Sequence, residues 1–358
     1  MGKNTALYVH VPFCDTKCIY CNFYSVKHKK ITTDLYKSAV IRNVQKYAAD
    51  ERVMFDTVYF GGGTPSLLWR EIAEITAFLR VNGALSANAE ISVEANPSDI
   101  NAEMLETLLK SGVNRISIGA QSLNDDELRF LGRRHDSKTA VKAVELTREA
   151  GFKNISVDII LGLPGQRDAS AVYELPVNHI SAYILKVEEN TPLARINPAI
   201  DEDLTAELYL KTVNILGKNG FPQYEISNFA ALGFECGHNL AYWRCGEYIG
   251  IGPAAHSYRD GKRFAVPEDA AAFIAAPLQE TYITEEEPGT FKEWAMLKLR
   301  LSEGITFAEC EARGVRREVI LKRAVSIPRG YLNISDGGVA LTAEGFLASN
   351  SVIGGLIG

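Results

Sequence analysis

The stretch His10-Val11-Pro12-Phe13-Cys14-Asp15-Thr16-Lys17-Cys18-Ile19-Tyr20-Cys21-Asn22-Phe23 brings three cysteines together near the start of the chain. Their C-x-x-x-C-x-x-C spacing suits a loop that curls around one centre and directs three thiolates at it. Thiolates are soft ligands that bind iron–sulfur clusters, zinc or Cu(I). A cubane cluster has four irons, so three protein ligands leave one iron open to a small molecule. We therefore predict a reactive iron–sulfur site held by Cys14, Cys18 and Cys21.

The same spacing leaves two other kinds of site open. A structural zinc needs a fourth ligand, which His10, His28 or Cys236 would have to supply. A disulfide with one spare thiol is the other alternative, but disulfides belong to oxidising compartments, and no apolar signal core precedes the first cysteine. The other cysteines are dispersed rather than arranged as a disulfide framework. We therefore expect a reduced, cytoplasmic protein.

Composition narrows the class of protein further. The chain has 358 residues, of which 46% are hydrophobic and 23% are charged, which is typical of a globular protein with a large core. The net charge of -6 argues against a general nucleic-acid binder, because such proteins neutralise phosphates with basic residues. No stretch is apolar for long enough to span a bilayer. We therefore expect neither a nucleic-acid partner nor a transmembrane segment.

Strand-like and helix-like segments alternate along much of the chain. Apolar, β-branched runs predict strands at Thr5–Val11, Val53–Phe60, Ile91–Ala95, Arg115–Gln121, Ile155–Leu161 and His179–Leu185. Periodic apolar positions predict helices at Thr33–Ala49, Ala102–Ser111, Ser137–Ala150 and Asp203–Lys218. This alternation indicates an α/β fold of parallel β/α units, in which functional side chains lie at the carboxyl ends of the strands.

A glycine-rich turn, Gly61-Gly62-Gly63-Thr64-Pro65, follows the second predicted strand. Thr64 would cap the next helix, as Thr33 would cap the preceding one, with Pro65 in the first helical position. The turn would then offer free N–H groups to a polar ligand such as a carboxylate. Glycines in such turns also serve purely steric needs, so the motif alone leaves both interpretations open.

Polar side chains gather at the carboxyl ends of several predicted strands. These positions are Cys14, Cys18, Cys21, Gly62, Thr64, Glu94, Gln121 and Asp158. Each residue by itself is more often a cap or a solvated loop residue. Their common location indicates one site at one end of the sheet.

Five motifs, taken in order, resemble those of the radical S-adenosylmethionine (SAM) proteins. They are C-x-x-x-C-x-Y-C, G-G-G-T-P, V-E-A-N-P (93–97), G-A-Q-S (119–122) and D-I-I-L-G-L-P-G-Q (158–166). More narrowly, the chain is similar to the group around oxygen-independent coproporphyrinogen III oxidase. The resemblance implies a partial (β/α) barrel of the TIM type that holds a [4Fe-4S] cluster, whose open iron binds the amino and carboxyl groups of SAM.

Carried over residue by residue, the resemblance also implies cofactor-binding positions. They are Tyr8 beside the cluster, Gly62, Gly63 and Thr64 around the methionyl part, and Glu94, Gln121, Arg133 and Asp158 around the rest of SAM. Carboxylates there would accept hydrogen bonds from ammonium or hydroxyl groups, and Arg133 would meet a carboxylate. One electron from the reduced cluster would split the sulfonium and give a 5′-deoxyadenosyl radical, which implies an electron donor as a partner.

Two features bear on the activity within that group. The corresponding motif of the oxidase is C-x-x-x-C-x-x-C-x-C. In this chain Phe23 stands at the position of the fourth cysteine, so the resemblance argues against oxidase activity. Downstream, the stretch 238–243 (H-N-x-x-Y-W) resembles the signature of the heme chaperones of the group. The resemblance implies a carrier that binds heme and hands it to an acceptor hemoprotein, with His238 as the heme contact.

The residues themselves leave alternatives open. Imidazole is a common heme ligand, and Tyr242 and Trp243 offer flat apolar contact, but His238 fits a hydrogen-bonded loop histidine and Trp243 a core anchor equally well. Cys236 is a second candidate iron contact, and His256 is expected to be structural. For the whole chain, the alternatives to a heme carrier are an active radical enzyme such as the oxidase, and a metal or electron-transfer protein without SAM. No catalytic residue is assigned.

We expect three parts: a barrel at 1–230, a connecting region with the H-N-x-x-Y-W stretch at 231–284, and a small domain at 285–358. The polar run 285–289 marks the second boundary. A helix at Phe291–Leu301, a hairpin at Leu332–Leu341 and a last helix starting at Thr342 predict a winged-helix-like domain. The chain is short between Gln166 and His179, so we expect a turn there in place of a helix.

Overall fold

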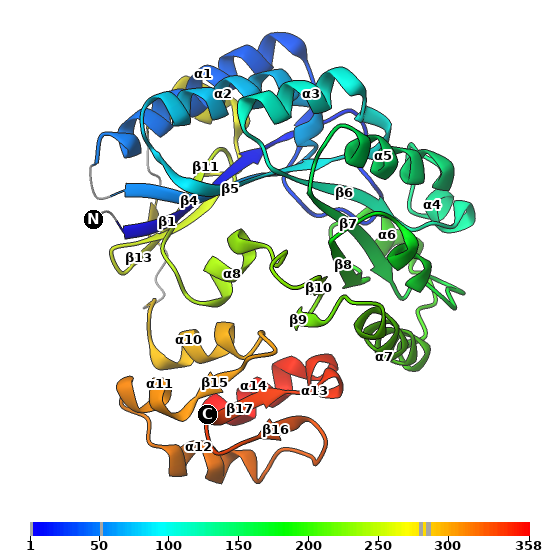
Figure 1. The fold of residues 1–358 in the computed structure, drawn as a ribbon, viewed down its shortest axis with the longest axis vertical. Coiled ribbons are helices and arrows are strands. Elements are labelled where there is room, and N and C mark those ends of the chain that lie inside the picture. Colours follow the sequence, from blue (N-terminus) through cyan, green and yellow to red (C-terminus); the bar gives the residue numbers. More distant parts are fainter. Residues whose placement is uncertain (1–2, 51–52, 279–281, 284–287) are drawn as a thin grey trace.

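The fold is known from a computed structural model that describes residues 3–50, 53–278, 282–283 and 288–358. In this part of the chain, one twelve-stranded sheet forms the frame, in the order β14-β13-β12-β11-β1-β4-β5-β6-β7-β8-β10-β9 (Figure 1). A three-stranded sheet lies in a small C-terminal domain below it, and a two-stranded one in the cysteine loop.

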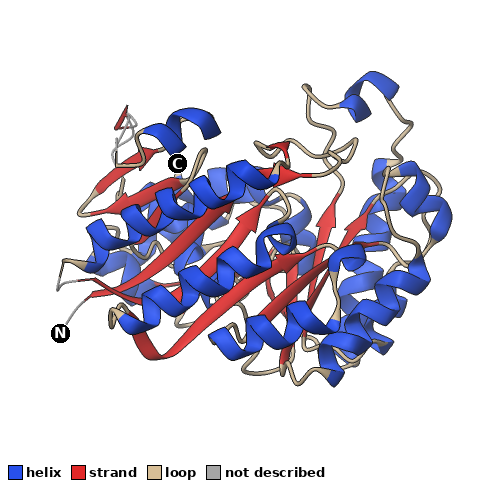
Figure 2. Cartoon of the chain, turned by 90° about the horizontal axis from the view of Figure 1, so that it is seen from above, coloured by secondary structure: helices blue, strands red, loops and turns tan. Residues whose placement is uncertain are grey.

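Six parallel strands form the centre of the large sheet, and each neighbours the next in chain order. They are β1 (Lys3–Val11), β4 (Val53–Gly62), β5 (Leu85–Ala95), β6 (Arg115–Gln121), β7 (Asn154–Leu161) and β8 (His179–Ile184). The connecting helices are α1 (Lys30–Ala48), α2 (Trp69–Val81), α3 (Ala102–Ser111), α4 (Asp125–Phe130), α5 (Ser137–Glu149), α6 (Pro192–Ile196) and α7 (Glu202–Lys218). The longer of these helices cover the outer face of the curved sheet (Figures 1 and 2), so the predicted α/β partial barrel is confirmed.

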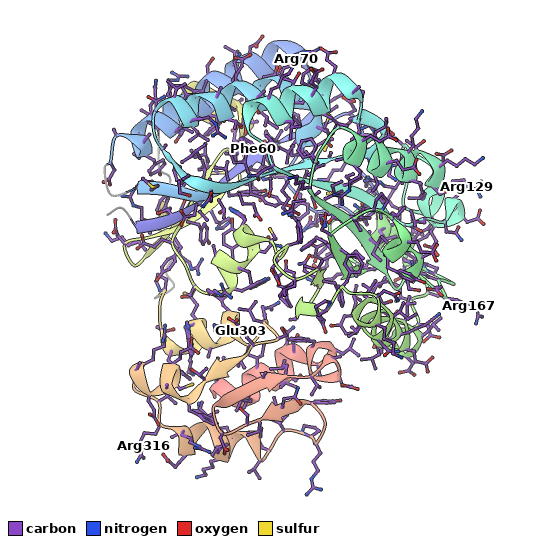
Figure 3. All side chains as sticks on the ribbon, in the orientation of Figure 1. Phe60, Arg70, Arg129, Arg167, Glu303 and Arg316 are labelled. Carbon is purple, nitrogen blue, oxygen red and sulfur yellow. The ribbon has the colours of Figure 1, made fainter. Side chains whose placement is uncertain are left out.

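The strands divide apolar from polar side chains by simple alternation. On β4, Val58 and Phe60 are fully buried in the core cluster that includes residues of α1 and α2, and Figure 3 shows Phe60 in the layer between sheet and helices. Burial of a side chain of this size contributes roughly 1.5–3 kcal/mol. Because successive residues of a strand point to opposite faces, Thr57 and Tyr59 must face the inside of the barrel.

The region 231–284 contributes to the same sheet. Strand β11 (Tyr248–Ile251) pairs with β1 in parallel, and β12 (His256–Arg259), β13 (Lys262–Ala265) and β14 (Tyr282–Ile283) extend that edge. At the other edge, β10 (Asn228–Ala230) and β9 (Gln223–Glu225) follow β8. The same region contains the short helices α8 (Gly237–Trp243) and α9 (Ala270–Ala275). The division of the chain at residue 230 stays a prediction, although the sheet continues across it.

The C-terminal domain has the predicted helices and hairpin. Its elements are α10 (Phe291–Lys298), β15 (Ile305–Thr306), α11 (Phe307–Ala312), α12 (Arg317–Ala324), β16 (Leu332–Ile334), β17 (Gly338–Leu341), α13 (Ala343–Leu347) and α14 (Ser349–Ile357). The strands β16 and β17 form the hairpin, β15 joins it, and Thr342 caps α13. The order of elements is helix–strand–helix–helix–hairpin, and the assignment as a separate winged-helix-like domain stays a prediction. Of the polar run 285–289 that marks the predicted boundary, residues 285–287 lie outside the described residues.

Of three local expectations, one is wrong, one is met in part and one is met. Thr33 does not cap α1, because the helix begins three residues earlier with Lys29 at the cap position, and the Thr33 hydroxyl donates to Glu71 instead. Thr64 does precede a 3-10 helix, Pro65–Leu68, but its side chain makes no capping bond. The short connection before β8 contains only the 3-10 helix Ser170–Glu174, as expected. Among the described helices, none is both long and apolar enough to cross a bilayer.

Candidate functional site

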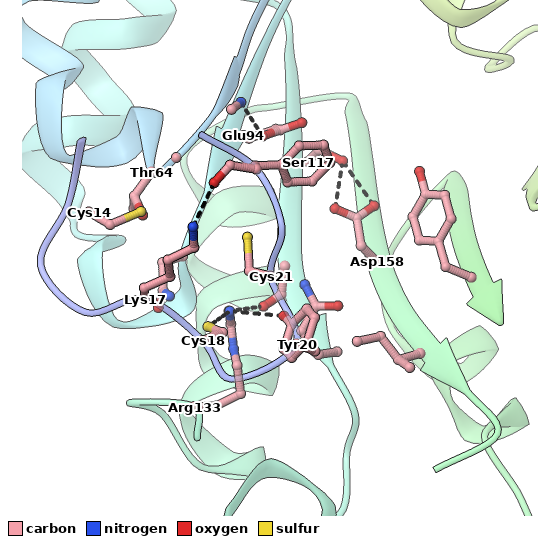
Figure 4. A pocket seen from close by; sticks show the side chains of 18 of the residues that line it. Cys14, Lys17, Cys18, Tyr20, Cys21, Thr64, Glu94, Ser117, Arg133 and Asp158 are labelled. Atoms are coloured by element: carbon pink, nitrogen blue, oxygen red, sulfur yellow. Dashed lines mark hydrogen bonds between the residues drawn. The ribbon is translucent and has the colours of Figure 1, made fainter. Parts of the chain in front are cut away.

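A pocket of about 390 Å³ opens at the carboxyl ends of the central strands (Figure 4). Ten of the predicted site residues line it. They are Cys14, Cys18, Cys21, Gly62, Gly63, Thr64, Glu94, Gln121, Arg133 and Asp158. Two predicted residues, Tyr8 and His238, are not among its lining residues. Parallel strands place the ends of separate chain segments at one edge, which explains how positions spread over more than a hundred residues share one cavity.

The cysteine loop is anchored at its start and contacts the pocket through its sulfurs. The strand β2 (Phe13–Cys14) pairs with β3 (Val26–Lys27), which closes the loop at its base. The Cys14 sulfur lies 3.2 Å from the Thr64 hydroxyl, and Arg133 donates to the Cys18 sulfur at 3.2 Å (Figure 4). Burial raises the pKa of the Cys21 thiol. The three thiols are therefore free, partly buried and directed at the same cavity.

These sulfurs do not converge on one point. Among the described residues, no group of three or more His, Cys, Asp or Glu side chains is placed to hold a single metal ion. A cubane cluster makes a different demand, because each thiolate binds a separate iron of a larger body. Of the alternative fourth ligands, His10 has both ring nitrogens in hydrogen bonds, to Tyr8 and to the Tyr24 carbonyl. Cys236 is fully buried and away from the pocket lining.

The glycine turn is built by steric need. Gly62 has φ of +111°, and a Cβ on Gly63 would lie 2.7 Å from the Phe13 carbonyl oxygen. The N–H groups of Gly63 and Thr64 bond to the carbonyls of Val11 and Phe13, and that of Gly62 to Glu94. The expectation of free N–H groups in this turn is therefore wrong, because the turn and the cysteine loop pack together through them. The turn still lines the pocket.

Two carboxyl groups lie at the inner wall of the pocket. Glu94 accepts hydrogen bonds from the Tyr59 hydroxyl (3.0 Å) and the Gly62 N–H (3.2 Å). Burial, together with the nearby Asp158 carboxylate, raises the pKa of Glu94 from its ordinary value to about 7. Asp158 accepts from the Ser117 hydroxyl at 3.1 Å, and burial raises its pKa as well. A ligand that presents an ammonium or hydroxyl groups would find two acceptors here and would favour their ionised forms.

A cationic side chain, Arg133, and a residue with strained backbone, Gln121, also line the pocket. Arg133 donates to the Gly119 carbonyl at 2.6 Å and to Cys18, so its guanidinium lies between β6 and the cysteine loop. Gln121 ends β6 with φ of +68°, a conformation that side chains other than glycine seldom adopt and that clusters at functional sites. Arg133 therefore places a positive charge beside the Cys18 sulfur.

His238 lies inside the barrel on α8, away from the pocket lining. It is 1% exposed, and its two ring nitrogens bond to the hydroxyls of Thr57 and Tyr242, both at 2.9 Å. Burial, with the Arg115 charge second, lowers the pKa of His238 to about 3. In this conformation the ring is neutral and neither nitrogen is free. Tyr8 lies nearby, with its ring 6.3 Å from that of His238, and it bonds to His10.

Sequence reasoning missed several inward-facing residues. Tyr59, Ser117 and Tyr183 line the pocket, and Arg115 is fully buried inside the barrel. For Tyr59 and Ser117 the signal was the period of two along the strand, because each stands between two buried apolar residues. Lys17 also lines the pocket, from the cysteine loop.

Similarity to known proteins shows the family of this chain. The profile of the Radical SAM superfamily matches residues 8–175. The heme chaperone HemW of Bacillus subtilis (strain 168) is 34% identical over 98% of this chain and 98% of that protein. The chain belongs to the HemW family of the Radical SAM superfamily. The heme chaperone HemW of Escherichia coli (strain K12) is 33% identical over 97% of both chains.

The chain is also similar to a mitochondrial protein and to a solved structure. The mitochondrial radical S-adenosyl methionine domain-containing protein 1 of Bos taurus is 34% identical over 89% of this chain and 74% of that protein. Among solved structures, coproporphyrinogen III oxidase (HemN) of Escherichia coli superposes with a TM-score of 0.82 at 20% identity, over 99% of this chain and 90% of that one. The latter likeness shows that HemN and this member of the HemW family share a fold.

Folding of this chain will be linked to protonation of His238. Its pKa is about 3 in the folded protein and near 6.5 when exposed, so the unfolded state binds the proton first as the pH falls. The contribution to stability is complete above pH 6.5 and decreases as the pH falls toward 3. We expect His238→Gln to flatten the fall in the free energy of unfolding between pH 6.5 and about 4, measured by urea denaturation. His256→Gln, on an exposed residue, is the control, and equal slopes in all three proteins would contradict the linkage.

Proposed function

We propose that this protein is a heme chaperone, which binds heme and transfers it to an acceptor hemoprotein on a scaffold that holds a [4Fe-4S] cluster and SAM. The observation that carries the proposal is the similarity to proteins named HemW over nearly the whole chain. Phe23, in place of a further cysteine, favours this function over that of a porphyrinogen oxidase. An electron donor to the cluster and a cytoplasmic location belong to the same proposal.

The donor set of the cysteine loop suits the cluster. Cys14, Cys18 and Cys21 would each bind one iron, and the fourth iron would stay open to SAM. Thr64 beside Cys14 and Arg133 beside Cys18 would donate to ligand sulfurs, and such outer hydrogen bonds tune a cluster. When bound, the cluster and SAM together supply one-electron chemistry at the sulfonium.

The rest of the pocket suits SAM. A cavity of about 390 Å³ lies in the range of small-molecule sites. Glu94 and Asp158 would accept from the N–H groups of the SAM amino group or from the ribose hydroxyls, and Arg133 would meet a carboxylate or hold the cysteine loop. Gly62, Gly63, Thr64 and Gln121 would shape the walls. Tyr8 does not line the pocket, so its proposed role would be indirect, through its hydrogen bond to His10.

His238 is the proposed heme contact, and the structure sets a condition on it. Iron coordination needs a free ring nitrogen, so the ring must leave either Tyr242 or Thr57 before it can bind iron. A shift of α8 relative to β4 would break the bond to Thr57. Cys236 is the second candidate, and burial raises its pKa to about 12, which disfavours the thiolate.

The cluster proposal predicts a strict dependence on the loop cysteines. Anaerobic reconstitution of the wild-type chain should give about four irons and four sulfides per chain, and Cys21→Ser should lose most of both because one cluster ligand is removed. Cys245→Ser, which changes another partly buried free thiol, should reconstitute normally. Iron and sulfide are measured by chemical analysis, and the cluster by electron paramagnetic resonance. Equal iron and sulfide contents in both variants would show that the cysteine loop does not supply the cluster ligands.

The SAM proposal predicts a pH dependence that resides in Glu94. Because the pKa of this carboxyl is about 7, SAM affinity should rise between pH 6 and pH 8 as the carboxylate forms, and then level off. Glu94→Gln should bind about tenfold more weakly at pH 8, as expected for loss of a charged hydrogen bond, and should lose the rise. Exposed Glu103→Gln is the matched control in equilibrium dialysis of the reconstituted protein. If SAM affinity still rises between pH 6 and pH 8 in Glu94→Gln, a group other than Glu94 is responsible for the pH dependence.

The heme proposal is tested by a pair of substitutions on α8. His238→Ala should weaken heme binding in an absorbance titration and slow transfer to an apo-hemoprotein. Tyr242→Phe frees the ring nitrogen Nε2 without removing the ring, so heme should bind faster than in the wild type. His256→Ala serves as the control.

The two variants separate a ligand from a packing role. Unchanged binding in His238→Ala would remove this residue as the contact. Substrate-coupled 5′-deoxyadenosine together with a decarboxylated porphyrinogen would instead indicate the oxidase.

A further inference from the structure

We propose that Tyr59 is a positioning residue that couples ligand occupancy of the pocket to the position of α8, an inference that rests on the proposed function of both sites. One side chain touches both. Its hydroxyl bonds to Glu94 in the pocket wall, and its ring is stacked on His238 in α8. Among the residues that the structure describes, Tyr59 combines a hydrogen bond to Glu94 with a ring contact to His238.

The contact with Glu94 is specific in geometry. The Tyr59 hydroxyl donates to Oε1 at 3.0 Å, while Oε2 accepts from the Gly62 N–H at 3.2 Å. Each carboxylate oxygen thus has one protein donor and keeps capacity for a donor from a ligand. Tyr59 itself lines the pocket, so a ligand at Glu94 acts on an atom that this tyrosine already holds.

The contact with α8 is made by the ring face. The ring centroids of Tyr59 and His238 are 5.1 Å apart with an interplanar angle of 24°, and Tyr8 lies 6.4 Å from the same tyrosine ring. Thr57, two residues earlier on β4, holds His238 from the same strand face. The imidazole is therefore held between β4 and Tyr242, and the Tyr59 ring defines the surface on which it lies.

The helix α8 lies between the sheet and the C-terminal domain (Figure 1). Its first turn is held by Glu90 of β5, which accepts from the N–H groups of Gly237 and His238. Its last residue, Trp243, has the Arg300 guanidinium 5.3 Å from its ring, and the following Arg244 pairs with Glu303. A change at His238 is thus placed to reach the small domain.

The direction of the coupling follows from electrostatics. Glu94 faces the Tyr59 hydroxyl and the Gly62 N–H from β4, Asp158 from β7 and Arg115 from β6. With the pocket empty, burial and Asp158 favour the protonated carboxyl, which is a weaker acceptor. A ligand ammonium or hydroxyl favours the carboxylate and so strengthens the bond from Tyr59, because hydrogen bonds to charged acceptors are the stronger ones. The Tyr59 ring, and α8 against it, should then be held more firmly.

The test compares Tyr59→Phe with the wild type. This change removes the hydroxyl and keeps the ring on His238. The readout is hydrogen exchange of the backbone amides of α8, measured by mass spectrometry on the full-length, reconstituted chain with and without SAM. SAM should slow exchange in α8 about fivefold in the wild type, the lower end of ordinary coupling between sites, and should leave it unchanged in Tyr59→Phe. Tyr209→Phe removes another hydrogen-bonded hydroxyl, remote from the pocket lining, and should behave as the wild type.

Reciprocity supplies a second measurement. Coupling between two sites acts equally in both directions. Thr57→Val removes a bond to His238 but does not line the pocket, so it should weaken SAM binding about fivefold in the wild-type background. In the Tyr59→Phe background the same change should have no effect on SAM affinity. A merely structural role for Tyr59 would leave the two substitutions additive.

The outcomes separate the coupling from the proposed function. SAM that binds normally without a change of exchange in α8, or that protects α8 equally in Tyr59→Phe, overturns the coupling alone. Additive effects of Thr57→Val and Tyr59→Phe overturn it as well. Failure of the wild-type chain to bind SAM overturns the cofactor part of the proposed function and the coupling with it. Heme enters neither measurement, so the heme proposal stands or falls by its own titration.

Discussion

The alternation of side chains along parallel strands is the constraint on which the rest of this structure depends. On β4, Val58 and Phe60 bury apolar area against the helices. Because side chains alternate along a strand, Thr57 and Tyr59 point into the interior of the barrel. The same rule on β5, β6 and β7 sends Glu94, Ser117 and Asp158 inward. Their polar groups must then be satisfied within the barrel, and they are satisfied by one another, as Tyr59 with Glu94 and Ser117 with Asp158.

The barrel interior is consequently shared by two layers. The upper layer is the pocket at the strand ends, where the cysteine loop, the glycine turn and Arg133 meet. The lower layer is α8, which brings His238 against β4 and Cys236 against Glu90. A protein that needed only the pocket could fill this space with apolar side chains. A helix with a buried, doubly hydrogen-bonded histidine is a costlier filling, and that cost is what makes the segment a candidate for function.

The sequence supported much of the site, for identifiable reasons. Cys14, Glu94 and Asp158 could be placed at strand ends because apolar runs before them predicted the strands, and parallel strands end together. The glycine turn was found by composition, but the fate of its N–H groups was not. That depends on contacts with Val11 and Phe13, which come from a different segment of the chain.

What the amino-acid order determined by itself was local: the period of two that makes strands, the punctuation that ends helices, and the clustering of three thiols in one loop. Only the tertiary structure decided that β11 joins β1, that α8 enters the barrel, and that both nitrogens of His238 are already bonded. The physical reason is distance along the chain. The hydroxyl of Thr57 and the imidazole of His238 are 181 residues apart, and no local pattern carries information about a partner that packing alone supplies.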